Sequence, residues 1–258
     1  MRLQLVELED LPWWPAVVRD LSTDYLHFGE TLFALHQPVV DLLGDALRDT
    51  QSRRLVDLCS GGAGPIPSLL AALRERGYEL SAVLTDRHPN PQAFQQAALK
   101  SNGAITFAAL PVDARAVPRE LTGFRTIFNA FHHFAPEDAA AVLRDACDAQ
   151  QPIGVFEIPQ RSLLTALPLL FTPIYVLLAT PFIRPFRWER LLWTYLLPLV
   201  LLTCWWDGLV SQLRAYEPSE LRNLATKAQP GYRWLAGRVP IGRTPGNLTY
   251  LIGVPEAP

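Results

Sequence analysis

Hydrophobic positions in the first fifth of the chain recur at helical spacing. Apolar residues between Trp13 and Leu47 mostly repeat every three or four positions, which is the period of a helix with one buried face. Pro38 lies within this stretch, and because proline disrupts a helix interior we expect an interruption before it. The pattern predicts an N-terminal helical cap over residues 1–50.

After residue 50, short apolar runs alternate with segments of helical period. Strands that alternate with helices of about 10–15 residues are typical of parallel βαβ units. The pattern predicts an α/β fold with a doubly wound, mostly parallel seven-stranded sheet and helices on both faces. The predicted strands are residues 55–58, 82–85, 105–110, 126–131, 153–158, 232–239 and 248–254, and the predicted helices are residues 66–76, 91–100, 136–149 and 218–227.

The last two predicted strands are separated only by the glycine-containing turn 242–246. A connection this short joins antiparallel neighbours, whereas parallel strands need a longer crossover. We therefore expect an antiparallel C-terminal strand pair at one edge of the sheet.

One segment after the fifth predicted strand is far more apolar than the rest. Residues 162–206 contain about 30 hydrophobic residues and only four charges, Arg184, Arg187, Glu189 and Arg190. The whole chain is 49% hydrophobic with a mean hydropathy of +0.11; without this segment the fraction falls to about 45%, an ordinary value for a globular chain. The chain thus divides into the cap, a ligand-binding domain of residues 51–160 and 216–258, and an apolar helical lid or insert of residues 161–215.

The insert allows three interpretations. Residues 162–183 and 191–206 carry no charge, and a helix needs about 20 apolar residues to cross a bilayer. Prolines at four positions would break such a helix, and the position of the insert after a strand favours a lid over the site instead. Peripheral membrane contact through residues 162–206 and a homodimer interface stay open. Its leucine and tryptophan side chains favour a small apolar, aromatic or lipid-like substrate. The four prolines are Pro168, Pro173, Pro181 and Pro198.

Charge and cysteine content exclude several classes of protein. With 23 basic and 25 acidic residues the net charge is −2, so the chain lacks the basic surplus typical of nucleic-acid-binding proteins. Cys59, Cys147 and Cys204 are widely spaced, which argues against a disulfide framework or a metal site and favours a reducing compartment. The acidic N-terminus lacks a secretory pattern. We expect a cytoplasmic protein that is membrane-associated only if the insert contacts a bilayer.

The first predicted strand of the sheet leads into a glycine-rich loop. Asp57 falls near the end of the strand, and Gly61, Gly62 and Gly64 follow it. In an open α/β fold such a loop lies at the carboxyl edge of the sheet, where ligands bind. Asp86 ends the next strand, 25 residues after Gly61, at the distance from which an acid binds a ribose diol.

These residues resemble the first motif of the class I S-adenosylmethionine-dependent methyltransferases, acid-x-Gly-x-Gly-x-Gly. Asp57 matches the acid and Gly61 the central glycine, whereas Cys59 and Ala63 replace the other two. The resemblance implies S-adenosylmethionine as cofactor, with its methionine part at Asp57 and the loop, its ribose at Asp86, its adenine amino group at Asp113, and its methyl group near the end of the fourth strand. The implied cofactor-binding residues are Asp57, Cys59, Ser60, Gly61, Gly62, Gly64, Asp86, Arg87, Asp113, Ala114, Asn129, Ala130 and Phe131.

A nucleotide-binding dehydrogenase is the nearest competing class. Its fingerprint requires Gly-x-Gly-x-x-Gly, because pyrophosphate presses on the first turn. Here Cys59 occupies the first glycine position, and Asp57 would place negative charge beside the phosphates. A carboxylate suits the cationic amino group of S-adenosylmethionine better. We therefore expect a methyltransferase that acts on a small apolar acceptor; a catalytically altered scaffold, or transfer of a group other than methyl, are the alternatives.

Five further residues are candidates for chemistry. His132 and His133 follow the fourth strand, and either could serve as a general base because the pKa of histidine suits that role. Tyr25, Trp205 and Asp207 are candidate substrate contacts. For Tyr25 plain packing competes with this role, and for Asp207 a helix-end position or an ion pair with Arg214 competes.

Overall fold

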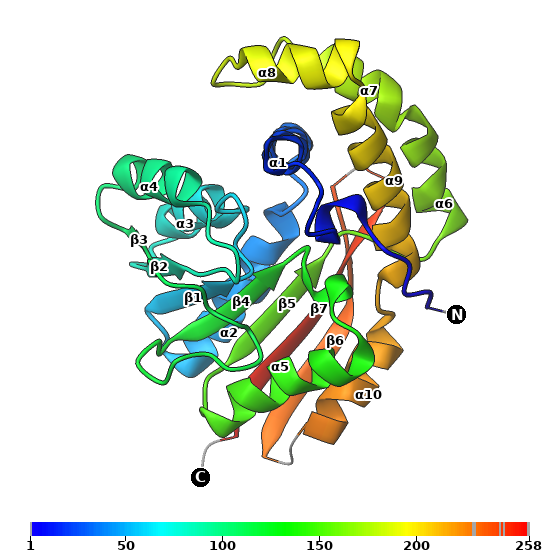
Figure 1. Ribbon diagram of the computed structural model, residues 1–258. Helices are drawn as coiled ribbons and strands as arrows, with labels where there is room; N and C mark the ends of the chain where they lie inside the picture. Colours follow the sequence, from blue (N-terminus) through cyan, green and yellow to red (C-terminus); the bar gives the residue numbers. More distant parts are fainter. Residues whose placement is uncertain (1, 229–230, 243, 245, 257–258) are drawn as a thin grey trace.

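The computed structural model describes residues 2–228, 231–242, 244 and 246–256. Its sheet has seven strands in the order β3-β2-β1-β4-β5-β7-β6 (Figure 1). Strands β1 to β5 are parallel, and β7 pairs antiparallel with both β5 and β6. The fold class is confirmed, with the antiparallel pair at one edge. The bounds are β1 (Arg54–Leu58), β2 (Ser81–Leu84), β3 (Ile105–Phe107), β4 (Phe124–Phe128), β5 (Ile153–Glu157), β6 (Tyr232–Pro240) and β7 (Asn247–Pro255).

Helices bury both faces of the sheet. Leu55 and Val56 are neighbours on β1 and are both fully buried, Leu55 in the core on one face and Val56 in the core on the other. A strand buried on both faces reads as a continuous apolar run, which explains why this segment is apolar throughout. On the side of Leu55 pack α2 (Gln37–Thr50), α3 (Ile66–Glu75) and α4 (Pro91–Lys100), and on the side of Val56 pack α5 (Pro136–Asp148) and α10 (Pro218–Ala228).

The N-terminal region contains the interruption that the sequence predicts. Helix α1 (Ala16–Leu32) ends at a turn in which Ala34 has φ +49°, and α2 begins with Pro38 in its first turn. Proline is tolerated there because the first turn needs no amide donor. Only α2 packs on the sheet; α1 crosses above the carboxyl ends of the strands, and a short 3-10 helix, η1 (Leu8–Asp10), precedes it (Figure 1).

The insert folds as short helices that curve around α1 (Figure 1). Prolines set their bounds, as expected: Pro168 and Pro173 lie in first turns, and Pro198 caps the last helix. Val176 and Val200 pack against Leu21 of α1 in a third core that does not involve the sheet. The elements are α6 (Leu163–Ala166), η3 (Leu167–Phe171), α7 (Thr172–Ala179), α8 (Trp188–Leu191), the π-helix η4 (Leu192–Leu196) and α9 (Leu199–Arg214).

Two predicted strands end three residues earlier than expected. Strand β3 stops at Phe107, and β4 stops at Phe128, where Asn129 adopts φ +48° and turns the chain out of the sheet. The next residues form a 3-10 helix, η2 (Phe131–His133). The prediction that residues 129–131 complete the fourth strand is therefore wrong. Within the predicted turn 242–246, residues 243 and 245 lie outside the described residues.

Candidate active site

A cavity of about 300 Å³ lies at the carboxyl ends of β1 and β4. Its floor is the glycine loop after β1, one side is Asp86, and another is formed by Asn129 and Ala130. Its roof is α1, with a contribution from Glu9 of η1. The strand order reverses between β1 and β4, and an open α/β sheet binds its ligand at such a switch point.

Asp57 supports the loop from below and does not line the cavity, which corrects the predicted cofactor contact. Its carboxylate is 1% exposed and accepts hydrogen bonds from the hydroxyls of Ser60 (2.7 Å) and Thr126 (2.6 Å). Burial raises the pKa of Asp57 to about 7, because these two bonds offset the loss of water only in part. Asp57 therefore shapes the loop from the protein side.

The two residues that replace glycines keep the backbone that glycine would adopt. Cys59 has φ +58° and Ala63 has φ +84°, in line with Gly61 at +52° and Gly64 at +49°. A side chain in this region costs about 1–2 kcal/mol per residue. The loop shape thus survives the substitutions at the cost of strain. Cys59, Ser60, Gly61, Gly62 and Gly64 all line the cavity, as the resemblance implies.

Asp86 joins the end of β2 to the loop. Its Oδ2 accepts a hydrogen bond from the amide of Gly61 (2.8 Å), and its Oδ1 accepts one from the amide of His88 (2.7 Å). Asp86 also lines the cavity, so the structure brings it to the loop as predicted.

Four other residues that were predicted to bind the cofactor lie outside the cavity lining. Arg115 donates two hydrogen bonds to Asp113 and thereby lowers the pKa of that carboxyl to about 2. Ala114 and Phe131 are buried in the core on the α5 side of the sheet, and Arg87 is exposed. Ala114 and Phe131 complete a core and are therefore not free to contact a ligand, whereas the assignments of Asp113 and Arg87 stay predictions.

Glu30 is a cavity residue that the sequence reasoning missed. It projects from α1 on the same face as Thr23, Leu26 and His27, all of which line the cavity. Asn129 donates a hydrogen bond from Nδ2 to Glu30 Oε1 (2.7 Å). Burial raises the pKa of Glu30 to about 7, although this bond opposes the shift. The missed signal was the spacing i, i+3, i+4, i+7, which places these residues on one helix face.

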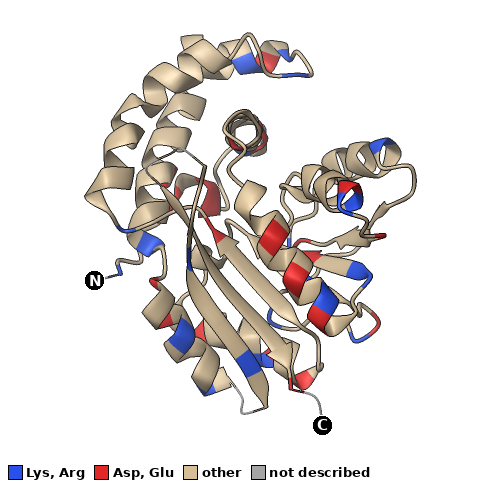
Figure 2. Cartoon of the chain, turned by 180° about the vertical axis from the view of Figure 1, so that it is seen from behind, with Lys and Arg blue, Asp and Glu red and all other residues tan. Residues whose placement is uncertain are grey.

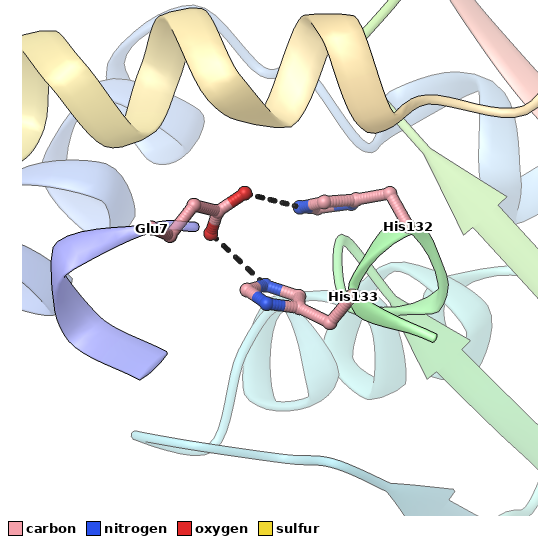
Figure 3. A group of neighbouring side chains, drawn as sticks. All are labelled: Glu7, His132 and His133. Carbon is pink, nitrogen blue, oxygen red and sulfur yellow. Dashed lines mark ion pairs between the residues drawn. The ribbon is translucent and has the colours of Figure 1, made fainter. Parts of the chain in front are cut away.

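His132 and His133 belong to a chain of alternating carboxylates and imidazoles (Figure 3). His132 Nδ1 lies 2.5 Å from Glu157 Oε2, and its Nε2 lies 3.7 Å from Glu7 Oε1. His133 Nε2 lies 3.5 Å from the other oxygen of Glu7, and its Nδ1 lies 3.1 Å from Asp10 Oδ1. His132 is buried, and His133 lines the cavity. Only His133 is therefore placed to touch a ligand.

The charges around His133 favour its protonated form. Burial alone lowers its pKa, but the hydrogen bond to Asp10 and the charges of Glu7 and Glu9 outweigh burial and raise the pKa to about 9. Glu7, His132 and His133 offer ligand atoms within 4.8 Å of one another, as a metal site would. The guanidinium of Arg214 already lies 3.2 Å from Glu7 Oε1. We interpret the group as a network of ion pairs, with Glu7 and Glu157 as members that the sequence did not single out for this role.

None of the three predicted substrate contacts lines the cavity. Tyr25 is buried, with its hydroxyl 2.7 Å from that of Thr180 and 3.0 Å from that of Thr194, so the packing alternative holds. Trp205 is half-buried on α9. The insert as a whole supplies no residue to the lining, so α1 forms the roof that the insert was predicted to form.

Asp207 holds the N-terminal segment in place. Its carboxylate accepts hydrogen bonds from the amides of Leu8 (2.6 Å) and Glu9 (3.2 Å), which begin η1. Burial raises its pKa to about 7. The alternative of an ion pair with Arg214 is also wrong, because Arg214 pairs with Glu7 and with Asp10 (2.7 Å).

Solved structures share this fold. An O-methyltransferase family protein from Burkholderia thailandensis is 17% identical and has a TM-score of 0.51 over 89% of this chain. The plantazolicin methyltransferase BpumL in complex with SAH is 12% identical with a TM-score of 0.56 over 92%, and PigF with SAH is 18% identical with a TM-score of 0.50 over 96%. The chain spans 59%, 90% and 62% of the lengths of these three proteins.

No protein-family model and no curated protein sequence matches the chain. At these low identities the likeness establishes the fold, which is that of the S-adenosylmethionine-dependent methyltransferases.

Proposed function

We propose that the chain is an S-adenosylmethionine-dependent methyltransferase that acts on a small apolar acceptor. The observation that carries this proposal is the cavity beneath α1, where the glycine loop, the carboxylate of Asp86 and the imidazole of His133 meet. When bound, the cofactor supplies an electrophilic methyl group on a cationic sulfur.

The cofactor side of the cavity offers groups that fit the ribose and the amino group of that molecule. A side chain built on Gly61 would meet no atom within 4 Å, so the loop backbone is open to a close approach by the cofactor. Asp86 stands at the end of the second strand, where an acid accepts hydrogen bonds from ribose hydroxyls. Glu30 faces the same space from α1 and suits the amino group of the methionine part.

The surroundings of Glu30 support this role. Its nearest basic neighbours are His27 and His36, whose Nδ1 atoms lie 3.9 and 4.0 Å from Glu30 Oε2. Burial lowers the pKa of His27 and, together with the charge of His27, lowers that of His36 to about 4. At neutral pH Glu30 therefore faces two neutral imidazoles, and a cationic ligand would stabilise its ionised form.

The acceptor side combines apolar walls with the imidazole of His133. Leu26, Phe128 and Phe134 line the cavity together with His133. Aromatic and aliphatic walls favour a small aromatic or lipid-like acceptor. In the proposed complex the ring of His133 contacts the acceptor, while its Nδ1 and Nε2 stay directed at Asp10 and Glu7. Alignment beneath α1 would supply the rate enhancement.

Calorimetric titration with S-adenosylmethionine tests the cofactor assignment. We expect binding by the wild-type chain and at least about tenfold weaker binding by Asp86→Ala, because a carboxylate that accepts hydrogen bonds from the ligand is lost. Asp148→Ala is the matched control, since that carboxylate is exposed at the end of α5 and lies outside the cavity lining. The absence of binding at millimolar cofactor would refute the proposal.

Turnover is tested by the release of S-adenosylhomocysteine in the presence of phenolic and aromatic carboxylate acceptors. Methyl transfer to any of them would also exclude the alternative of a catalytically altered scaffold. His133→Gln should lower kcat while cofactor affinity is retained, because the proposed contact of His133 is with the acceptor.

A further inference from the structure

The insert exposes an unusual amount of apolar side chain. We call residues 162–206 the arch, after their curved path over α1 in Figure 1. Leu163 is 92% exposed, and Trp188 and Leu196 are each 74% exposed. Isolated exposed leucines are normal on a protein surface, but a contiguous set of this size marks an interaction site. Other exposed apolar side chains of the arch are Leu167, Leu170, Phe171, Ile174, Leu178 and Phe182.

Helix α7 shows how this surface arises. Val176 and Ala179 are buried against α1, whereas Ile174 and Leu178 on the same helix are exposed. The helix is thus apolar on its inner and its outer side. A helix that is apolar all round is normally covered on every side, by protein or by lipid.

The charged residues of the arch are confined to one turn. Arg184, Arg187, Glu189 and Arg190 lie within seven residues, and Figure 2 shows colour within the arch only near α8. Arg190 is buried and donates a hydrogen bond to Asp24 of α1 (2.7 Å), which fixes the turn to the body of the protein. Arg184 is exposed, as are its neighbours Phe186 and Trp188.

We propose that the arch docks on the surface of a phospholipid bilayer that contains anionic lipids. Exposed aromatic and arginine side chains beside an apolar face are the set that lies at the headgroup level of membranes. Arg184 supplies the charge complementarity to anionic headgroups. The leucines and phenylalanines of α6, η3 and α7 would enter the acyl boundary.

The helices of the arch are short, as in an element that lies on a membrane surface. No single helix among the described residues is long and apolar enough to span a membrane, and the pair Trp188–Leu196 and Leu199–Arg214, which together have the length and the composition of a membrane-spanning segment, is bent by 73°. Short apolar helices that run along a protein surface can lie within the interface without crossing it.

A bilayer fits this surface better than a second copy of the chain. A protein interface combines an apolar centre with a polar, charged rim, whereas the helices of the arch carry charge at one end only. The outer side of the arch is also convex (Figure 1), so two copies would touch over a small area. A fluid lipid surface adapts to a convex face.

The arch adjoins the roof of the cavity. Tyr175 of α7 donates a hydrogen bond to the backbone carbonyl of Tyr25 on α1 (2.8 Å). Leu26, the next residue, lines the cavity and is 53% exposed. The arch is therefore tied to the helix that roofs the cavity. The docking proposal does not rest on the proposed function.

Vesicle co-sedimentation of the full chain without cofactor tests the proposal. We expect binding to vesicles of phosphatidylcholine with phosphatidylglycerol and weaker binding to phosphatidylcholine alone. Leu178→Asp should weaken the partitioning by about tenfold or more, because it replaces an apolar side chain that would enter the bilayer with a charge. Arg184→Ala should weaken it by about fivefold on the anionic vesicles only.

Matched variants away from the arch distinguish docking through the arch from non-specific adsorption to vesicles. Leu99→Asp alters a leucine of α4 that is 75% exposed, and Arg144→Ala removes an exposed arginine of α5; both should bind vesicles as the wild type does. Sedimentation velocity without lipid tests the competing outcome, in which the arch forms the interface of a homodimer. An absence of vesicle binding, binding unaffected by Leu178→Asp, or a dimer that Leu178→Asp dissociates without any vesicle binding would each overturn the proposal. Because cofactor is absent, these results do not depend on the proposed methyl transfer.

Discussion

Replacing Glu30 with glutamine tests whether a helix above the sheet completes the cofactor site. The carboxylate of Glu30 is held by Asn129 at 2.7 Å and has a pKa raised to about 7 by burial. If it binds the cofactor amino group, only its ionised form is competent. Binding of the cofactor should then strengthen as the pH rises toward 7.

The size of the effect follows from this pKa. An acid of pKa 7 is ionised in about one molecule in eleven at pH 6 and in about half at pH 7, where an α-amino group of pKa about 8 is still protonated. The wild-type affinity should therefore rise about fivefold between pH 6 and pH 7. A hydrogen bond to a charged group contributes about 1.5–3 kcal/mol. Glu30→Gln should therefore weaken binding at pH 8 by at least about tenfold.

Isothermal titration calorimetry at pH 6, 7 and 8 measures both quantities. Asp57 and Asp207 also have pKa values near 7, so the slope in the variant is the decisive comparison. Glu30→Gln should have a much flatter pH profile than the wild type. A nucleoside thioether that lacks the amino acid part serves as the ligand control, and its affinity should be the same for both chains. The reasoning is refuted if the variant keeps the wild-type slope, or if it weakens the truncated ligand equally.

Three further substitutions test the supporting structure. Because the folded-state pKa of Asp57 is raised from 3.8 to about 7, its ionisation destabilises the fold as the pH rises through this window. The unfolding free energy of Asp57→Asn relative to wild type, from urea titrations, should therefore be about 2.5 kcal/mol higher at pH 8 than at pH 5, and a constant difference would contradict this. Asp207→Ala removes the acceptor of two amides of η1 and should lower the unfolding free energy by about 1–2 kcal/mol, whereas Asp207→Asn should recover part of that loss. Ala63→Gly relieves a backbone at φ +84° and should raise the thermal midpoint, with a gain of about 1 kcal/mol; a lower midpoint would show that the buried methyl group matters more than the strain.

Local pattern was enough to predict most of the fold. The apolar run of β1 and the glycines after it fall where short-range periodicity and turn chemistry place them, because strands buried on both faces and helix ends have strong local signatures. The end of β4 was missed, since the turn at Asn129 depends on a partner far along the chain: Asn129 Oδ1 accepts a hydrogen bond from the amide of Ile158 (2.8 Å). No local pattern reports such a contact.

The residues of the candidate site also divide into those that the sequence predicted and those that it did not. Asp86 and the loop residues were predicted because residues that follow consecutive parallel strands lie together at the carboxyl edge of the sheet. Glu30, Glu7 and Glu157 reach the site from separate segments, and their roles depend on which elements cross above the sheet. The expectation that the insert forms the roof failed for this reason, because α1 already occupies that place and the arch packs on its outer side.

Residue order and spacing thus determine the α/β sheet, its glycine loop and the short, proline-bounded helices of the insert, since these depend on interactions within a few residues or one supersecondary unit. Tertiary packing determines which carboxylates are buried and which face the cavity, and it turns Asp57 and Asp207 from candidate ligand contacts into supports. The physical reason is that desolvation and hydrogen-bond partners arise from neighbours distant in sequence. The same packing covers one side of the apolar arch with α1 and exposes the other.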